Sequence, residues 1–99
     1  MKTPQIPRND FASGLRKTRD AQGLSQEDFG LVSSRTYVSS LERGLKSPTL
    51  NKVDDLANTL GVHPLTLLVV SYVDDYGKEP VMDLLDRIRE ELLTVTQRK

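Results

Sequence analysis

Cysteine and tryptophan are both absent from this sequence of 99 residues, and aromatic residues make up only 5% of it. The absence of cysteine excludes disulfides, thiolate chemistry and thiolate metal sites. Long apolar runs are also missing, whereas a membrane-spanning helix needs about 18 to 20 consecutive apolar residues. The first ten residues contain two prolines and no apolar run, so we expect no secretory signal. We therefore expect a cytoplasmic protein that does not span a membrane.

The length leaves room for one domain, because a second independent core would need roughly 50 or more residues of its own. Hydrophobic residues make up 36% of the chain and charged residues 28%, as in a small globular protein. Apolar and polar residues nowhere alternate over more than four positions, so strands have little support, whereas helical spacing recurs along the chain. The sequence predicts an all-α protein.

Capping residues, helix-opening prolines and terminal glycines divide the chain into six predicted helices. The signals for helix starts are, in chain order, Asn9 or Asp10, Ser25, Ser33 or Ser34, Pro48 with Thr49, Pro64 and Pro80. The first, third and fourth helices end at Gly23, Gly44 and Gly61. The second helix, between Ser25 and the next cap, must be short. His63, directly before Pro64, is expected to cap the fifth helix.

We expect a flexible arm at residues 1–8, a compact five-helix domain at 9–73, a connector at 74–79 and an additional amphipathic helix within 80–99. The fifth helix is apolar nearly all round, which predicts burial on more than one side. In the last helix, apolar residues recur with the 3.5-residue average of a coiled-coil seam, at Val81, Leu85, Ile88, Leu92 and Val95. This stripe either pairs with a second subunit or folds back on its own chain.

Opposite charges are separated along the chain although the formal net charge is zero. Residues 1–52 contain nine basic and five acidic side chains, a balance of +4, and residues 53–99 contain five basic and nine acidic ones, a balance of −4. The split suggests that the amino-terminal half meets an anionic partner.

Three motifs follow one another in the basic half. They are Gly23-Leu24-Ser25-Gln26-Glu27-Asp28-Phe29, then Ser34-Arg35-Thr36-Tyr37-Val38-Ser39-Ser40-Leu41-Glu42-Arg43-Gly44, then Lys46-Ser47-Pro48-Thr49-Leu50. Their order, within about residues 9–70, resembles the Cro/CI (XRE) family of prokaryotic transcription regulators, with its lambda-repressor-like helix-turn-helix domain. The chain departs from the family in having two residues fewer between Gln26 and Glu42, which shortens the turn between the second and third helices.

The resemblance implies a regulator that binds an operator in double-stranded DNA as a homodimer, with the third helix in the major groove. On that helix the short polar side chains and one arginine are candidates for base contacts, namely Ser34, Arg35, Thr36 and Ser39. Candidates for phosphate contacts are Gln26, Ser40, Arg43, Lys46, Ser47 and Lys52. Arg19 and Glu42 are expected to form a structural ion pair. The expected dimer interface comprises Leu68, Tyr72, Val81, Leu85, Ile88 and Leu92.

Two other classes of function compete with this interpretation. An enzyme has little support, because His63 is the only histidine and the adjacent pairs Asp54-Asp55 and Asp74-Asp75 would point in two directions on a helix. We therefore predict no catalytic residue, metal site or cofactor. The stronger alternative is a protein-interaction module on the same fold, such as an antitoxin, which would meet a protein partner through its acidic carboxyl-terminal half.

Overall fold

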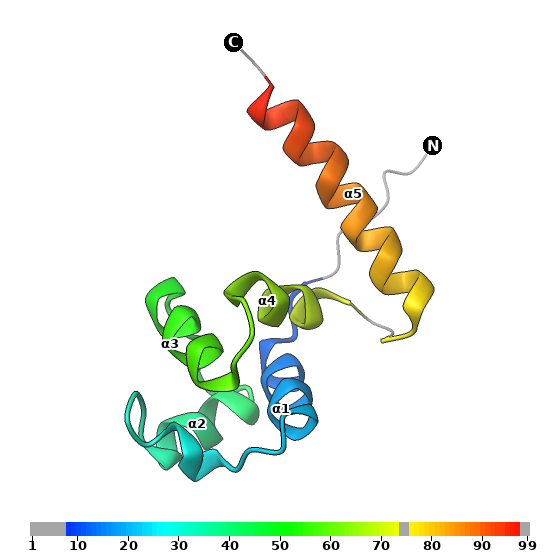
Figure 1. Cartoon of the computed structure of the whole chain (residues 1–99). Coiled ribbons are helices and arrows are strands. Elements are labelled where there is room, and N and C mark those ends of the chain that lie inside the picture. Colours follow the sequence, from blue (N-terminus) through cyan, green and yellow to red (C-terminus); the bar gives the residue numbers. More distant parts are fainter. Residues whose placement is uncertain (1–7, 74–75, 98–99) are drawn as a thin grey trace.

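The computed structural model describes residues 8–73 and 76–97, and these residues form helices connected by turns and loops, without strands. The elements follow one another as α1 (Phe11–Ala21), η1 (Gln26–Phe29), α2 (Arg35–Glu42), α3 (Leu50–Leu60), α4 (Pro64–Tyr72) and α5 (Lys78–Thr96). Figure 1 shows α1 to α4 gathered into a bundle from which α5 projects. The prediction of an all-α fold is confirmed, and the short second helix is a single turn of 3-10 helix, η1.

The helices begin at the side chains expected to cap them. Asp10 accepts a hydrogen bond from the Ser13 amide at 3.2 Å, and the Ser34 and Thr49 hydroxyls accept from amides three residues later at 3.1 Å each. His63 Nδ1 accepts from the Leu65 amide at 2.9 Å. Each of these bonds satisfies an amide that has no partner within its helix.

Helix α5 begins at Lys78, two residues before the predicted start at Pro80. The first amides of a helix have no intrahelical acceptor, so a proline in the first turn sacrifices no helical hydrogen bond. Pro80 therefore marks the first turn rather than its first residue.

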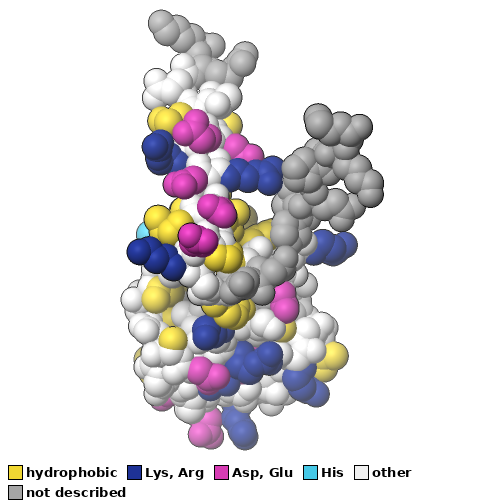
Figure 2. Space-filling view, turned by 90° about the vertical axis from the view of Figure 1, so that its right-hand side faces the viewer, with side chains coloured by type: hydrophobic (Ala, Val, Ile, Leu, Met, Phe, Trp, Pro, Cys, Tyr) yellow, Lys and Arg dark blue, Asp and Glu magenta, His cyan; other side chains and the backbone are white. Residues whose placement is uncertain are grey.

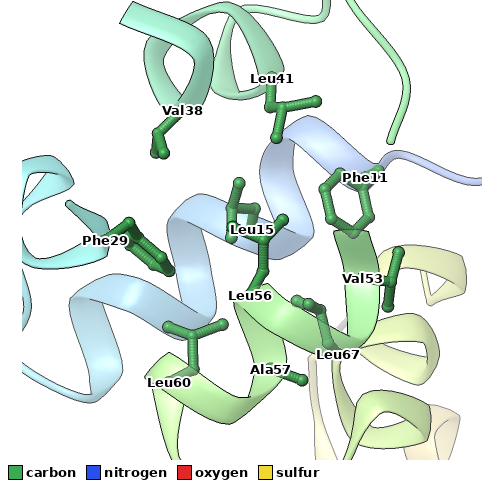
Figure 3. Close-up of a cluster of buried hydrophobic side chains, with 10 residues drawn as sticks. All are labelled: Phe11, Leu15, Phe29, Val38, Leu41, Val53, Leu56, Ala57, Leu60 and Leu67. Atoms are coloured by element: carbon green, nitrogen blue, oxygen red, sulfur yellow. The ribbon is translucent and has the colours of Figure 1, made fainter. Parts of the chain in front are cut away.

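The hydrophobic core lies among the first five elements, and Figure 3 shows its side chains converging from all of them. Its members are Phe11, Leu15, Phe29, Val38, Leu41, Val53, Leu56, Ala57, Leu60 and Leu67. Helix α5 contributes no buried residue. The segment that contains the predicted recognition helix is thus anchored to a core that α5 does not help to form.

Helices α1 and α4 pack at very short range where Gly14 faces Ser71. The Asp10 amide, just before α1, donates to the Ser71 carbonyl oxygen of α4 at 2.6 Å. A side chain at position 14 would overlap the Ser71 hydroxyl. Glycine is needed here for the close approach of two backbones.

Only one side of α4 is fully buried, through Leu67 and Ser71. The prediction of burial on more than one side is wrong for the single chain, because Leu65 is 62% exposed and Tyr72 40%. Helices α4 and α5 instead enclose an open groove of about 290 Å³ that is lined mainly by apolar side chains. Among the described helices, none is both long and apolar enough to cross a membrane.

Candidate nucleic-acid interface

Helix α2 is amphipathic, with Val38 and Leu41 in the core. The opposite side exposes Arg35 and Thr36, and Ser39 is half-buried beside them. Ser34 is exposed at the start of the helix, where its hydroxyl caps the first turn. The four candidate base-contact residues therefore lie at the beginning and along the outer side of one short helix.

Ser40, a predicted phosphate contact, is only 8% exposed. It directly precedes the core residue Leu41, and its position on the helix turns it toward the interior. Such burial disfavours a contact with DNA.

An open pocket of about 320 Å³ lies on the outer side of α2. Its walls are polar and come from Arg35, Thr36, Ser39, Arg43 and, from η1, Gln26. Gln26 therefore shares a surface with three of the candidate base-contact residues. Among the phosphate-contact candidates, Arg43 also lines this pocket, and Ser47 lines a different depression beside the start of α3.

Arg19 of α1 and Glu42 of α2 form a bidentate ion pair behind this pocket. Arg19 Nε donates to Glu42 Oε2 at 2.6 Å, and Arg19 Nη2 donates to Oε1 at 2.9 Å. The Glu42 side chain is 4% exposed and that of Arg19 is 15% exposed. Arg19 Nη1 also donates to the Leu24 carbonyl at 3.0 Å, so one guanidinium ties α1 to α2 and to the segment before η1.

The environment of Glu42 keeps its carboxylate ionised. Burial by itself would raise the pKa of Glu42, but the hydrogen bonds from Arg19 and Gln26 and the charges of Arg19 and Arg16 outweigh burial and lower the pKa. The hydrogen bond with Glu42 correspondingly raises the pKa of Arg19. Both partners of the pair therefore stay charged, on the side of α2 that faces the interior.

The shortened turn between η1 and α2 is held by Lys52 of α3. The Lys52 ammonium donates to the Val32 carbonyl at 2.7 Å, and it lies 5.6 Å from the centre of the Tyr37 ring. The Lys46 ammonium lies at the same distance, 5.6 Å, from that ring. Lys46 and Lys52, both predicted phosphate contacts, therefore place their charges beside the Tyr37 ring. Lys52 also has the hydrogen bond to Val32.

The residues predicted to form a dimer interface lie on α4 and α5. Leu68 is half-buried and Tyr72 is partly exposed on α4, and Val81 and Ile88 of α5 are half-buried. Leu85 and Leu92 are exposed, at 39% and 55%. The apolar stripe of α5 is thus divided: Ile88 lines the groove with α4, whereas Leu85 and Leu92 remain open to solvent.

Sequence reasoning missed two contacts of Glu42 that lie beside the candidate interface. Arg16 Nη1 donates to the Glu42 carbonyl at 3.0 Å, and Gln26 Nε2 donates to Glu42 Oε1 at 3.1 Å. The spacing of Arg16 and Arg19, three residues apart on one side of a helix, was an available signal for the first contact. No local pattern could indicate the second.

The match to a known protein family covers the same region of the chain. The family model described as helix-turn-helix matches residues 15–67. The uncharacterized HTH-type transcriptional regulator y4dJ of Sinorhizobium fredii (strain NBRC 101917 / NGR234) is 36% identical over 67 residues, covering 66% of this chain and 87% of that protein. Control protein C.BamHI of Bacillus amyloliquefaciens is 33% identical over 61 residues, covering 59% of this chain and 75% of that protein.

Two solved structures share the fold. The restriction-modification controller protein C.AhdI from Aeromonas hydrophila has a TM-score of 0.55 at 37% identity, covering 59% of this chain and 91% of that one. The hypothetical transcription factor NHTF from Neisseria has a TM-score of 0.56 at 29% identity, covering 69% of this chain and 86% of that one. The chain therefore belongs to the helix-turn-helix family of transcriptional regulators, of the Cro/CI (XRE) type that its motifs resemble.

Proposed function

We propose that this chain binds a specific operator sequence in double-stranded DNA as a homodimer, with α2 in the major groove. The observation that carries the proposal is the outer side of α2, where two arginines and short hydroxyl side chains surround an open polar pocket. None of the described residues that line this pocket carries a carboxylate, and Glu42 of α2 is buried and paired with Arg19. Such a surface combines positive charge with hydrogen-bonding groups that can reach base edges.

Within this proposal, Arg35 reads a base through its guanidinium, which can donate two parallel hydrogen bonds to guanine O6 and N7. Each such contact discriminates against a wrong base by about 1–3 kcal/mol. Ser34, Thr36 and Ser39 supply shorter hydroxyl contacts on the same side of α2. The hydroxyl of Ser34 also caps the helix, so its contact with DNA would be as an additional acceptor or donor.

Phosphate contacts are proposed at the edges of this surface, from Arg43, Lys46, Ser47 and Lys52. The exposed amino end of α3, capped by Thr49, lies in the same loop region and adds backbone amides that favour an anion. Figure 2 shows lysine and arginine side chains spread over the bundle together with some acidic ones, and both kinds on the projecting α5, where acidic residues outnumber basic ones. Attraction to phosphate on one part and repulsion from the other would orient the domain on DNA.

The homodimer is proposed to form through α4 and α5. Both helices leave apolar side chains exposed, and a stripe of only two heptads is too short to dimerise by itself. Helix α5 with the exposed side of α4 supplies the larger surface that a stable interface needs. A two-fold dimer would present two α2 helices to half-sites about one helical turn of DNA apart.

The proposed regulator works without catalysis and in the cytoplasm, and the names of its relatives support the regulatory part of this proposal. One is named a transcriptional regulator, and two are named control or controller proteins. Their similarity covers the bundle that holds α2 and supports the proposal for that part of the chain.

The proposal is tested by footprinting the purified chain on the DNA upstream of its own gene, followed by affinity measurements over a range of salt concentrations. A protected site is expected, with the logarithm of the affinity falling by about 0.9 per phosphate contact for each unit in the logarithm of salt concentration. Binding that is absent or insensitive to salt would contradict the proposal and favour a protein-interaction module that uses the acidic α5.

A further inference from the structure

We propose that Gln26 reads an adenine in the operator half-site, rather than contacting a phosphate. The inference rests on the proposed function, because it requires the outer side of α2 to enter the major groove. It assigns a specificity role to a residue of η1, outside the helix that supplies the other base contacts.

The first argument is the position of Gln26. Its side chain is half-buried at the start of η1, and it forms part of the wall of the pocket with Arg35, Thr36 and Ser39. A group in this wall meets whatever enters the pocket together with the base-contact candidates. Arg43 lines the same wall and is proposed to contact phosphate, so the position of Gln26 permits a base contact, and the orientation and chemistry of its amide choose between base and phosphate.

The second argument is the orientation of the amide. Gln26 Nε2 donates to Glu42 Oε1 at 3.1 Å. Glu42 is ionised and paired with Arg19. A carboxylate only accepts hydrogen bonds, so the amide nitrogen of Gln26 must point toward it. The opposite flip of the amide would place its oxygen against the carboxylate. One N–H and the carbonyl Oε1 of Gln26 remain without a partner in the described parts of the chain.

The third argument is the chemistry of those two remaining groups. One donor and one acceptor on a planar amide match the N7 acceptor and the N6 amino donor of adenine, which a glutamine can bind with two hydrogen bonds. A phosphate offers only acceptors, so it would leave Oε1 unpaired. Its negative charge would also lie beside the Glu42 carboxylate, which accepts from the same amide.

Selection of binding sites from a library of randomised DNA duplexes tests the inference with the full chain. The wild type is expected to enrich one adenine in each half-site whose replacement weakens binding about 5- to 150-fold. Gln26→Leu removes both hydrogen-bonding groups at similar volume, and it is expected to bind all four bases at that position equally.

Two further variants keep the result interpretable. Gln26→Arg is expected to change the preference at the same position from adenine to guanine, a gain that misfolding cannot produce. Lys46→Ala is the phosphate-contact control: it should weaken binding to all sequences alike and reduce the salt slope by about one.

If Gln26→Leu instead weakens binding to all sequences alike and keeps the preference for adenine at that position, Gln26 contacts a phosphate and the inference is overturned. An adenine preference that survives in both Gln26 variants overturns it too, while leaving the proposed function in place. If the wild type enriches no sequence at all, the proposed function fails, and the inference fails with it.

Discussion

Arg19 Nε of α1 lies 2.6 Å from Glu42 Oε2 at the end of α2, and the same carboxylate accepts the Gln26 amide at 3.1 Å. One buried carboxylate therefore joins the first helix, the η1 turn and the predicted recognition helix. These bonds constrain the orientation of α2 within the bundle, so the ion pair links the stability of the fold to the geometry of the proposed DNA surface.

Replacement of Glu42 by alanine is expected to destabilise the protein by about 3 kcal/mol, because it removes the buried, bidentate partner of the Arg19 guanidinium and leaves only the Leu24 carbonyl and the exposed Asp20 carboxylate. For a domain of this size, that corresponds to a fall in melting temperature of more than about 10 °C. Thermal unfolding followed by circular dichroism measures the effect. Glu91→Ala is the matched control, since its pair with Arg87 is exposed at both partners and contributes only about 0.5 kcal/mol. Equal melting of the two variants would contradict the structural role of Glu42.

The same carboxylate should make stability depend on pH. Its pKa in the folded protein is lowered from 4.5, whereas in the unfolded chain it returns to that ordinary value. The ionised form therefore stabilises the fold fully above about pH 5, and this contribution is lost as the pH falls through the lowered pKa. Urea unfolding of the wild type and of Glu42→Gln, between about pH 6 and pH 3, should show a stability difference that shrinks with acidification. A difference that stays constant over this range would refute the assignment.

Gly14→Ala is expected to destabilise the bundle by about 1–3 kcal/mol, although alanine favours a helix by about 1 kcal/mol over glycine. The added methyl group would overlap the Ser71 hydroxyl and lie only 3.0 Å from the Ser71 Cα, so α1 and α4 must separate. Gly30→Ala is the comparison, because its methyl group would meet only the Glu27 carbonyl, at 3.3 Å. Urea unfolding should rank Gly14→Ala well below Gly30→Ala, and the reverse order would contradict the close contact.

Alanine variants of Lys46 and Lys52 should weaken DNA binding alike but differ in folding stability. Both are proposed to contact phosphate, so each alanine variant should weaken DNA binding and reduce the salt slope by about one. Only Lys52 also donates to the Val32 carbonyl, and its loss should cost a further 1 kcal/mol or so of folding stability. Parallel melting and binding curves measure the two effects. Equal stability of the two variants would show that Lys52 does not hold the turn.

The sequence predicted those features that short-range chemistry determines. Ser34, Thr49 and His63 cap helices because their side chains reach amides two or three residues away, and such contacts can be read from neighbouring letters. The Arg19–Glu42 pair was expected only from the family resemblance. The bond between Gln26 and Glu42 joins residues 16 positions apart, and it depends on how η1 and α2 pack, which no local pattern encodes.

The apolar stripe of α5 marks the limit of such prediction. Regular spacing placed Ile88 and Leu92 on one side of a helix, but it could not decide whether that side meets α4 or a second subunit. The structure divides the stripe, with Ile88 against the α4 groove and Leu92 in solvent. Helix α5 adds nothing to the buried core, so core packing explains Leu67 of α4 but not the apolar residues of α5.

The last prediction concerns the homodimer. Leu92 is 55% exposed and contributes nothing to the core of its own chain. The melting temperature of Leu92→Glu should therefore lie within about 2 °C of that of the wild type measured at a dilution where it is monomeric. At the proposed interface, the new carboxylate would be desolvated without a partner, which is costly. Light scattering should therefore show a dimer for the wild type and a monomer for Leu92→Glu.

Thr94→Glu introduces the same charge two residues further along α5, where the side chain points about 200° around the helix from Leu92. This variant should remain dimeric, because it lies outside the apolar stripe. The monomeric Leu92→Glu should also bind operator DNA more weakly than Thr94→Glu, since a single bundle reaches only one half-site. A Leu92→Glu variant that still dimerises would exclude the outer side of α5 from the interface and leave the exposed face of α4 to account for any dimer.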